Sequence, residues 1–284
     1  MKEVRIGGVP EHFNYAWYLG LKSKAFRSRG INLRWTDCHG GTGEMVQALE
    51  NNTIDLAVVL TEGIVKAITD GNQSKIVQTF VQSPLIWGIH VAETSPYLEL
   101  SELKNKNAAI SRKGSGSHLM AYINAQQLSW DTEHDLKFKI VKNLEGGVRA
   151  LTDGEADYFM WEKFTTKPLV DNKTFRRIGE CPTPWPCFVI AARNEFIKND
   201  SDVLRSVLEI INGITEDFKS IPEIDQIISK RYGQKQKDVQ AWLNSTEWSQ
   251  KNINDNTIEA VQHQLIALDI IDFKLPYSEL VKSI

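Results

Sequence analysis

The stretch MVQALENNTIDLAVVL, residues 45–60, has a counterpart about a hundred residues later in GVRALTDGEADYFMWE, residues 147–162. Four residue types recur at a constant offset of 102 (148 − 46 = 102 and 157 − 55 = 102): Val46, Ala48, Leu49 and Asp55 correspond to Val148, Ala150, Leu151 and Asp157. Each stretch reads as a helix, a polar turn and a strand that begins beside the aspartate. The recurrence predicts one such unit in each of two similarly built lobes, with the aspartates at matching places and serving turns.

Short apolar strands alternate with helical segments around both copies. The first series of strands comprises residues 4–9, 31–36, 55–60 and 75–82, and the second comprises residues 107–111, 136–141, 157–161 and 175–179. Strand–helix alternation at this spacing is typical of βαβ units on a parallel sheet. From residue 201 to the end the pattern is helical. We therefore expect an α/β protein with two mainly parallel sheets flanked by helices and a helical C-terminal segment.

Two extended apolar segments, residues 85–92 and 187–192, divide the two series. Pro84 and Pro186 precede them. A chain that leaves the first lobe, builds the second and then returns would form a two-strand hinge with a ligand cleft between the lobes. The boundaries predict a first lobe of residues 1–83 and 187–284, and a second lobe of residues 84–186.

Composition excludes several classes of protein. The net charge of −3 provides no electrostatic footprint for nucleic acid or an anionic membrane, and no run of eighteen apolar residues predicts a membrane span. Three irregularly spaced cysteines do not form a disulfide framework, and no His or Cys pair has metal-ligand spacing. Because the sequence begins directly with a strand, we expect a cytoplasmic protein; an exported protein whose signal had been removed, periplasmic or membrane-anchored, would look the same.

Five segments in order, from RIGG at residue 5 to FVIAARNEF at residue 188, resemble the type II periplasmic solute-binding proteins of the nitrate, taurine and alkanesulfonate group. They include GGTGEMVQALENNTIDLAVV, SELKNKNAAISRKGSGSH and EGGVRALTDGEADYFMWE, and the resemblance covers residues 4–215. The same superfamily includes the fungal enzyme that makes the thiamine pyrimidine, whose cysteine-rich motif is absent here. The resemblance implies a two-lobed fold that closes on a small ligand, and a subgroup of it lacks an export signal.

Candidate ligand contacts lie in the loops that follow the carboxyl ends of the strands, where open α/β sheets bind ligands. They are His12, Phe13, Asn14, His39, Gly41, Thr42, Thr61, Glu62, Gln82, Arg112, Ser115, Gly116, Ser117, His118, Trp161, Glu162 and Trp185. Trp161 and Trp185 either flank a flat ligand or pack in the core, and His12 and His39 either contact the ligand or form local hydrogen bonds.

The loop SRKGSGSH, residues 111–118, is the most informative of these. Its glycines allow close backbone approach, and Ser115 or Ser117 can cap the helix that follows. Exposed amides, the helix dipole and Arg112 or Lys113 would together favour an anion. In the resembled family the matching loop holds the acidic head of the ligand, whereas the residues alone also fit an ordinary capped helix.

The sequence therefore predicts a monomeric binding protein for a small anionic or pyrimidine-like molecule, without cofactor or metal and without a nucleic-acid partner. An ABC permease is the expected partner if the chain is exported. The alternatives are a cytoplasmic enzyme related to thiamine-pyrimidine synthesis and a ligand-sensing effector domain.

Overall fold

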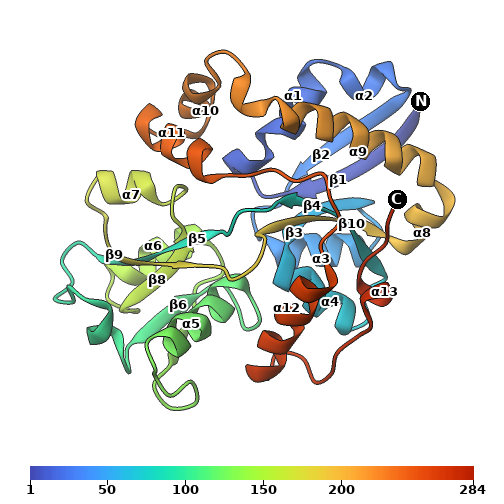
Figure 1. Ribbon diagram of the computed structural model, residues 1–284. Helices are drawn as coiled ribbons and strands as arrows, with labels where there is room; N and C mark the ends of the chain where they lie inside the picture. Colours follow the sequence, from blue (N-terminus) through green and yellow to red (C-terminus); the bar gives the residue numbers. More distant parts are fainter. The chain divides into compact units, whose positions relative to one another are not determined.

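The computed structural model describes residues 1–284, which form two compact units (Figure 1). Unit 1 consists of Met1–Ser83 and Trp185–Ile284, and unit 2 consists of Pro84–Pro184. The chain therefore passes from unit 1 to unit 2 and back. The second boundary lies two residues before the position expected from Pro186, because Trp185 and Pro186 make their hydrogen bonds with Glu62 and Thr61 of unit 1.

The sheet of unit 1 has the strand order β2-β1-β3-β10-β4. Strand β1 pairs in parallel with β2 and β3, whereas β10 is antiparallel to β3 and β4. The returning chain thus enters the sheet in the opposite direction and fills the place between two strands that it made earlier. The strands are β1 (Lys2–Gly8), β2 (Ile31–Asp37), β3 (Leu56–Leu60), β4 (Ser74–Val81) and β10 (Phe188–Arg193).

Helices cover both faces of this sheet (Figure 1). Helix α1 packs against α9 on one face, and α4 packs against α3 and α12 on the other. The helical elements are η1 (His12–Asn14), α1 (Tyr15–Lys22), α2 (Ala25–Ser28), α3 (Thr42–Glu50), α4 (Thr61–Thr69), α8 (Asn194–Asn199), α9 (Ser201–Glu216), η3 (Phe218–Ser220), α10 (Ile224–Tyr232), α11 (Gln236–Ser245), α12 (Asp255–Ala267) and α13 (Tyr277–Leu280). No helix is long and apolar enough to cross a membrane.

Unit 2 repeats this topology with the order β7-β6-β8-β5-β9. Strand β6 is parallel to β7 and β8, and the incoming strand β5 is antiparallel to β8 and β9. Its elements are β5 (Ile86–Ala92), η2 (Leu100–Leu103), β6 (Asn107–Ile110), α5 (Gly116–Gln127), β7 (Lys137–Ile140), α6 (Leu144–Thr152), β8 (Tyr158–Glu162), α7 (Lys167–Asp171) and β9 (Phe175–Pro182). Its core contains Phe159 and Phe175, against which Leu151 of α6 packs.

The two aspartates of the repeated stretches occupy equivalent positions, which confirms the prediction from their spacing. Asp55 precedes β3, and its carboxylate accepts the amide of Arg5 in β1 at 2.9 Å. Asp157 precedes β8, and its carboxylate accepts the amide of Asn107 in β6 at 2.8 Å. The partners share the offset of the aspartates (107 − 5 = 102). Both lie at the amino ends of their strands, so the carboxyl ends remain available for binding loops.

Candidate functional site

The N-terminus of α5 is built by a turn of serines and glycines after β6. Gly114 adopts a left-handed conformation with φ of +73°, which glycine tolerates without strain. Ser115 caps the helix, because its Oγ accepts the amide of His118 at 3.3 Å. The Ser117 hydroxyl accepts the amide of Ser111 at 2.9 Å and lies 3.1 Å from the hydroxyls of Ser111 and Ser115. The hydrogen bonds among these buried hydroxyls therefore stabilise the conformation of the turn.

Two amides of this turn are unpaired. The N–H groups of Gly116 and Ser117, the first residues of a 12-residue helix, have no acceptor within the chain. They are donors of the kind that a helix N-terminus presents to anions, and the helix dipole adds a partial positive charge. Gly116 leaves the first of them without a side chain beside it.

Arg112 adds a full positive charge to the same loop. Its side chain is partly buried, and its guanidinium forms no ion pair or hydrogen bond with the protein. Burial lowers the pKa of Arg112, because the charged form loses solvation that no neighbouring carboxylate replaces. An anion bound at the helix N-terminus would supply the missing counter-charge. Lys113, the other cation of the loop, is exposed.

His118 stabilises the turn as a neutral side chain. Its Nδ1 accepts the amide of Gly114 at 3.1 Å, so the ring proton is on Nε2. The ring packs edge-on against Tyr122 and Phe138. Burial, assisted by the charge of Lys113, lowers the pKa of His118 to about 4. The side chain therefore supports the loop at neutral pH without adding charge.

The remaining candidates of unit 2 lie at the end of β8. Trp161 stacks on Phe159 with ring centroids 5.2 Å apart and meets Trp87 edge-on at 6.4 Å. The carboxylate of Glu162 accepts the amides of Phe164 at 3.0 Å and Thr165 at 2.6 Å. Burial raises the pKa of Glu162 to about 7. Trp161 is thus a partly buried packing group, and Glu162 organises the turn after the strand.

The equivalent strand end in unit 1 holds a second buried carboxyl group. Glu62 is 2% exposed, and its Oε2 accepts the indole N–H of Trp185 at 2.9 Å. Its Oε1 has no hydrogen-bond donor, and burial raises the pKa of Glu62 to about 7. Thr61 donates to the carbonyl oxygen of Pro186. The structure therefore brings the return crossing at Trp185 and Pro186 against Thr61 and Glu62, which directly follow β3.

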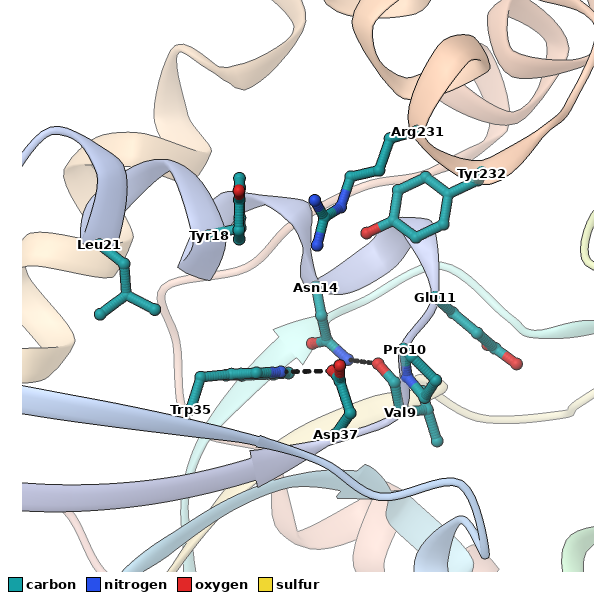
Figure 2. Close-up of a pocket in the computed structure, with 10 residues that line it drawn as sticks. All are labelled: Val9, Pro10, Glu11, Asn14, Tyr18, Leu21, Trp35, Asp37, Arg231 and Tyr232. Carbon is teal, nitrogen blue, oxygen red and sulfur yellow. Dashed lines mark hydrogen bonds between the residues drawn. The ribbon is translucent and has the colours of Figure 1, made fainter.

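The first loop of unit 1 separates into a buried part and a pocket-lining part. His12 and Phe13 contact the ring of Trp242, with centroids 4.4 Å and 5.3 Å apart. Burial lowers the pKa of His12 to about 3, so its imidazole is neutral. Asn14 instead lines a pocket of about 210 Å³ within unit 1, together with residues of β2, α1 and α10 (Figure 2).

The loops after β2 and β4 carry the last four candidate residues. His39 is exposed, and Gly41 precedes α3 with φ of +65°, the conformation that favours glycine. Thr42 begins α3, and its buried Oγ1 has no hydrogen-bond partner. Gln82 is exposed, and its backbone amide donates to the carbonyl oxygen of Glu247. Ligand contacts by these residues stay a prediction.

Sequence reasoning missed the pocket of Figure 2, because two of its residues, Arg231 and Tyr232, belong to α10. Helical periodicity identifies that segment as a helix but does not indicate which strand ends it covers. The local signal that could have indicated the pocket is the RY pair, Arg231 and Tyr232, at the end of this helix.

Comparisons with known proteins find a family model and solved structures that are similar to this chain. A family model described as Ca3427-like PBP matches residues 87–181, which lie in unit 2. The Candida albicans CA3427 gene product, described as having the generic periplasmic binding protein fold, matches with a TM-score of 0.90 at 22% identity, covering 100% of this chain and 97% of that one. No curated protein sequence matches the chain significantly.

Two sulfonate-binding proteins also match over the whole chain. The alkanesulfonate-binding protein SsuA of Xanthomonas axonopodis pv. citri, bound to MOPS, has a TM-score of 0.86 at 15% identity, covering 100% of this chain and 99% of that one. The periplasmic aliphatic sulphonate binding protein SsuA of Escherichia coli has a TM-score of 0.75 at 15% identity, with coverages of 100% and 92%. Identities this low show a shared fold.

Proposed function

We propose that this chain, which has the fold of type II periplasmic binding proteins, is a solute-binding protein for a small organic anion. The anionic head group is held at the N-terminus of α5 by the amides of Gly116 and Ser117 and by Arg112. An ABC permease is the partner that the proposal implies for an exported form.

The unpaired guanidinium of Arg112 is the observation that carries this proposal. A partly buried cation without a counter-charge is unfavourable unless an anion occupies its surroundings. Here it shares a loop with two helix N-terminal amides that also have no acceptor. Free amides at the first two helical positions occur in any capped helix, because the Ser115 side chain satisfies only the amide of His118. The unpaired guanidinium beside them is the feature that an ordinary capped helix does not require.

Sulfonates are the first ligand class to test. Both SsuA proteins are described as sulfonate-binding, and the MOPS bound to one of them is a sulfonate. A sulfonate offers three acceptor oxygens, which suit two amides and one guanidinium. Nitrate also offers three oxygens but holds them in one plane, and a carboxylate offers only two. An uncharged pyrimidine offers no charge for Arg112.

Calorimetric titration with methanesulfonate, MOPS, taurine, inorganic sulfate, nitrate, acetate and the hydroxymethylpyrimidine precursor of thiamine tests the proposal. We expect at least one sulfonate to bind, and Arg112→Gln to weaken it about ten- to a hundred-fold through loss of a charge-assisted hydrogen bond. Arg205→Gln, an exposed position on α9, is the matched control and should leave the affinity unchanged. Binding of the pyrimidine alone, insensitive to Arg112→Gln, would favour the enzyme-related alternative.

A further inference from the structure

A pocket lined only by residues of unit 1 forms a second candidate site. It is the pocket of about 210 Å³ at the carboxyl ends of β1 and β2, closed by α1 and by the end of α10 (Figure 2). This volume is below the roughly 300–1,000 Å³ typical of sites for drug-sized ligands. The pocket therefore suits a molecule of amino-acid size.

Three charged residues line the pocket, Glu11, Asp37 and Arg231, and the last two carry opposite charges that do not neutralise each other. The guanidinium carbon of Arg231 lies 3.9 Å from the centre of the Tyr18 ring, a cation–π contact. The Asp37 carboxylate accepts the indole N–H of Trp35 at 2.8 Å. Arg231 and Asp37 form no ion pair, although both line the same space. Asp37 is thus held by Trp35, and Arg231 is held by Tyr18 and Tyr232, with which it also forms side-chain hydrogen bonds; both keep their charge at the pocket wall.

Asn14 adds a buried acceptor to the same wall. The side chain is 5% exposed, and its Nδ2 donates to the carbonyl oxygen of Val9 at 2.9 Å, which orients the amide. Its Oδ1 has no hydrogen-bond donor in the protein. In Figure 2 the Asn14 amide lies between Asp37 and the Tyr18 side of the pocket. Buried carbonyl oxygens are normally satisfied, so this one indicates that an occupant of the pocket supplies a donor.

We propose that this pocket binds a small zwitterion, a molecule that carries one ammonium and one carboxylate group. Asp37 and the Oδ1 of Asn14 accept from the ammonium group, and Arg231 and the hydroxyl of Tyr232 donate to the carboxylate. The rings of Tyr18 and Trp35 flank the carbon atoms between the two charges. The pocket shares no residue with the proposed anion site at the α5 loop.

Titration of the full chain with glycine, L-alanine, β-alanine and γ-aminobutyrate tests this proposal and varies the separation of the charges. The indole N–H resonance of Trp35, identified by its loss in Trp35→Phe, reports binding because that group donates to Asp37. We expect at least one zwitterion to shift this resonance saturably. Acetate and methylamine each carry only one of the two charges. Their affinities should be at least about tenfold lower than that of the best zwitterion.

Matched variants distinguish this site from the anion site. Asp37→Asn and Arg231→Gln should each weaken the zwitterion about ten- to a hundred-fold, whereas Arg112→Gln and Arg205→Gln should change its affinity less than about twofold. The proposal is overturned if no zwitterion shifts the Trp35 resonance at tens of millimolar. It is equally overturned if Arg112→Gln abolishes binding while Asp37→Asn does not, since the zwitterion would then occupy the α5 loop. Melting curves of each variant verify that it is folded.

Discussion

Glu62 is the residue whose ionisation should control stability near neutral pH. Burial raises its pKa to about 7, whereas an unfolded glutamate titrates near about 4.3. Between these values the folded chain binds more protons than the unfolded chain, so stability falls as pH rises. The contribution of the protonated side chain is complete below about pH 4 and is lost as pH rises through about 7.

Replacing Glu62 by glutamine removes this titration and keeps an acceptor for Trp185. Relative to the unmodified protein, Glu62→Gln should therefore gain about 2–4 kcal/mol of unfolding free energy between about pH 5 and about pH 8.5. Urea denaturation at the two pH values measures the difference. Glu216→Gln, at an exposed position, should change the unfolding free energy by the same amount at both pH values. An unchanged difference for Glu62→Gln would mean that the folded protein holds this carboxylate ionised at both pH values.

At the scale of the secondary-structure element, the start of α5 is the most sensitive position for binding. Valine at Gly116 would place a branched side chain beside the free amides, whereas Lys113→Ala removes an exposed charge. We expect Gly116→Val to weaken the ligand about ten- to a hundred-fold, and more than Lys113→Ala does. Titration calorimetry with the best sulfonate, beside melting curves, makes the comparison. Unchanged affinity in a folded Gly116→Val protein would show that the loop is only a helix cap.

Gly146 in helix α6 occupies a position where a side chain does not fit. A Cβ on Gly146 would lie 1.9 Å from the carbonyl oxygen of Val141, which is backbone and cannot rotate away. Gly146→Ala should therefore cost at least about 1–3 kcal/mol of stability. Gly213, exposed within α9, has no atom within 4 Å of such a Cβ, so Gly213→Ala should gain about 0.5–1 kcal/mol. Thermal unfolding of the Gly146→Ala and Gly213→Ala variants measures the sign of each stability change. An unchanged stability in Gly146→Ala would mean that α6 shifts to make room for the methyl group.

The elements themselves were predictable because their periodicity is local. The strands and helices of both series appear where alternating patterns placed them, and Ser115 caps α5 as expected from its position. The antiparallel direction of β5 and β10 was not predictable, because it depends on which distant strands they join. The pocket that includes Arg231 was missed for the same reason: the position of α10 is set by tertiary packing.

For the whole molecule, the repeated stretch was informative because it reports a shared topology. The predicted two-lobed α/β fold is confirmed by the two equivalent five-stranded sheets and by the CA3427 and SsuA structures. Ligand identity could not follow from the same pattern. The proposed anion site depends on groups such as the guanidinium of Arg112, whose lack of a partner is visible only in the folded chain.

The two units differ in one respect that allows each to be tested alone: unit 2 is a single continuous segment, Pro84–Pro184. Its ends are held together because β5 and β9 are paired from Ile86 with Pro182 onwards. It also has its own apolar core around Phe159 and Phe175. Continuous chain, paired ends and a separate core are what independent folding requires.

We therefore expect residues 84–184, expressed alone, to fold and to unfold cooperatively in urea. Because Arg112, Gly116 and Ser117 all belong to this segment, it should bind inorganic sulfate within about threefold of the affinity of the full chain. Methanesulfonate should bind it within the same range, since the contacts proposed for the sulfonate group all come from Arg112, Gly116 and Ser117. Calorimetric titration of both proteins makes the comparison, with Arg112→Gln in the segment as the control. Loss of sulfate binding in a segment that still unfolds cooperatively would show that the α5 loop does not hold an anion by itself.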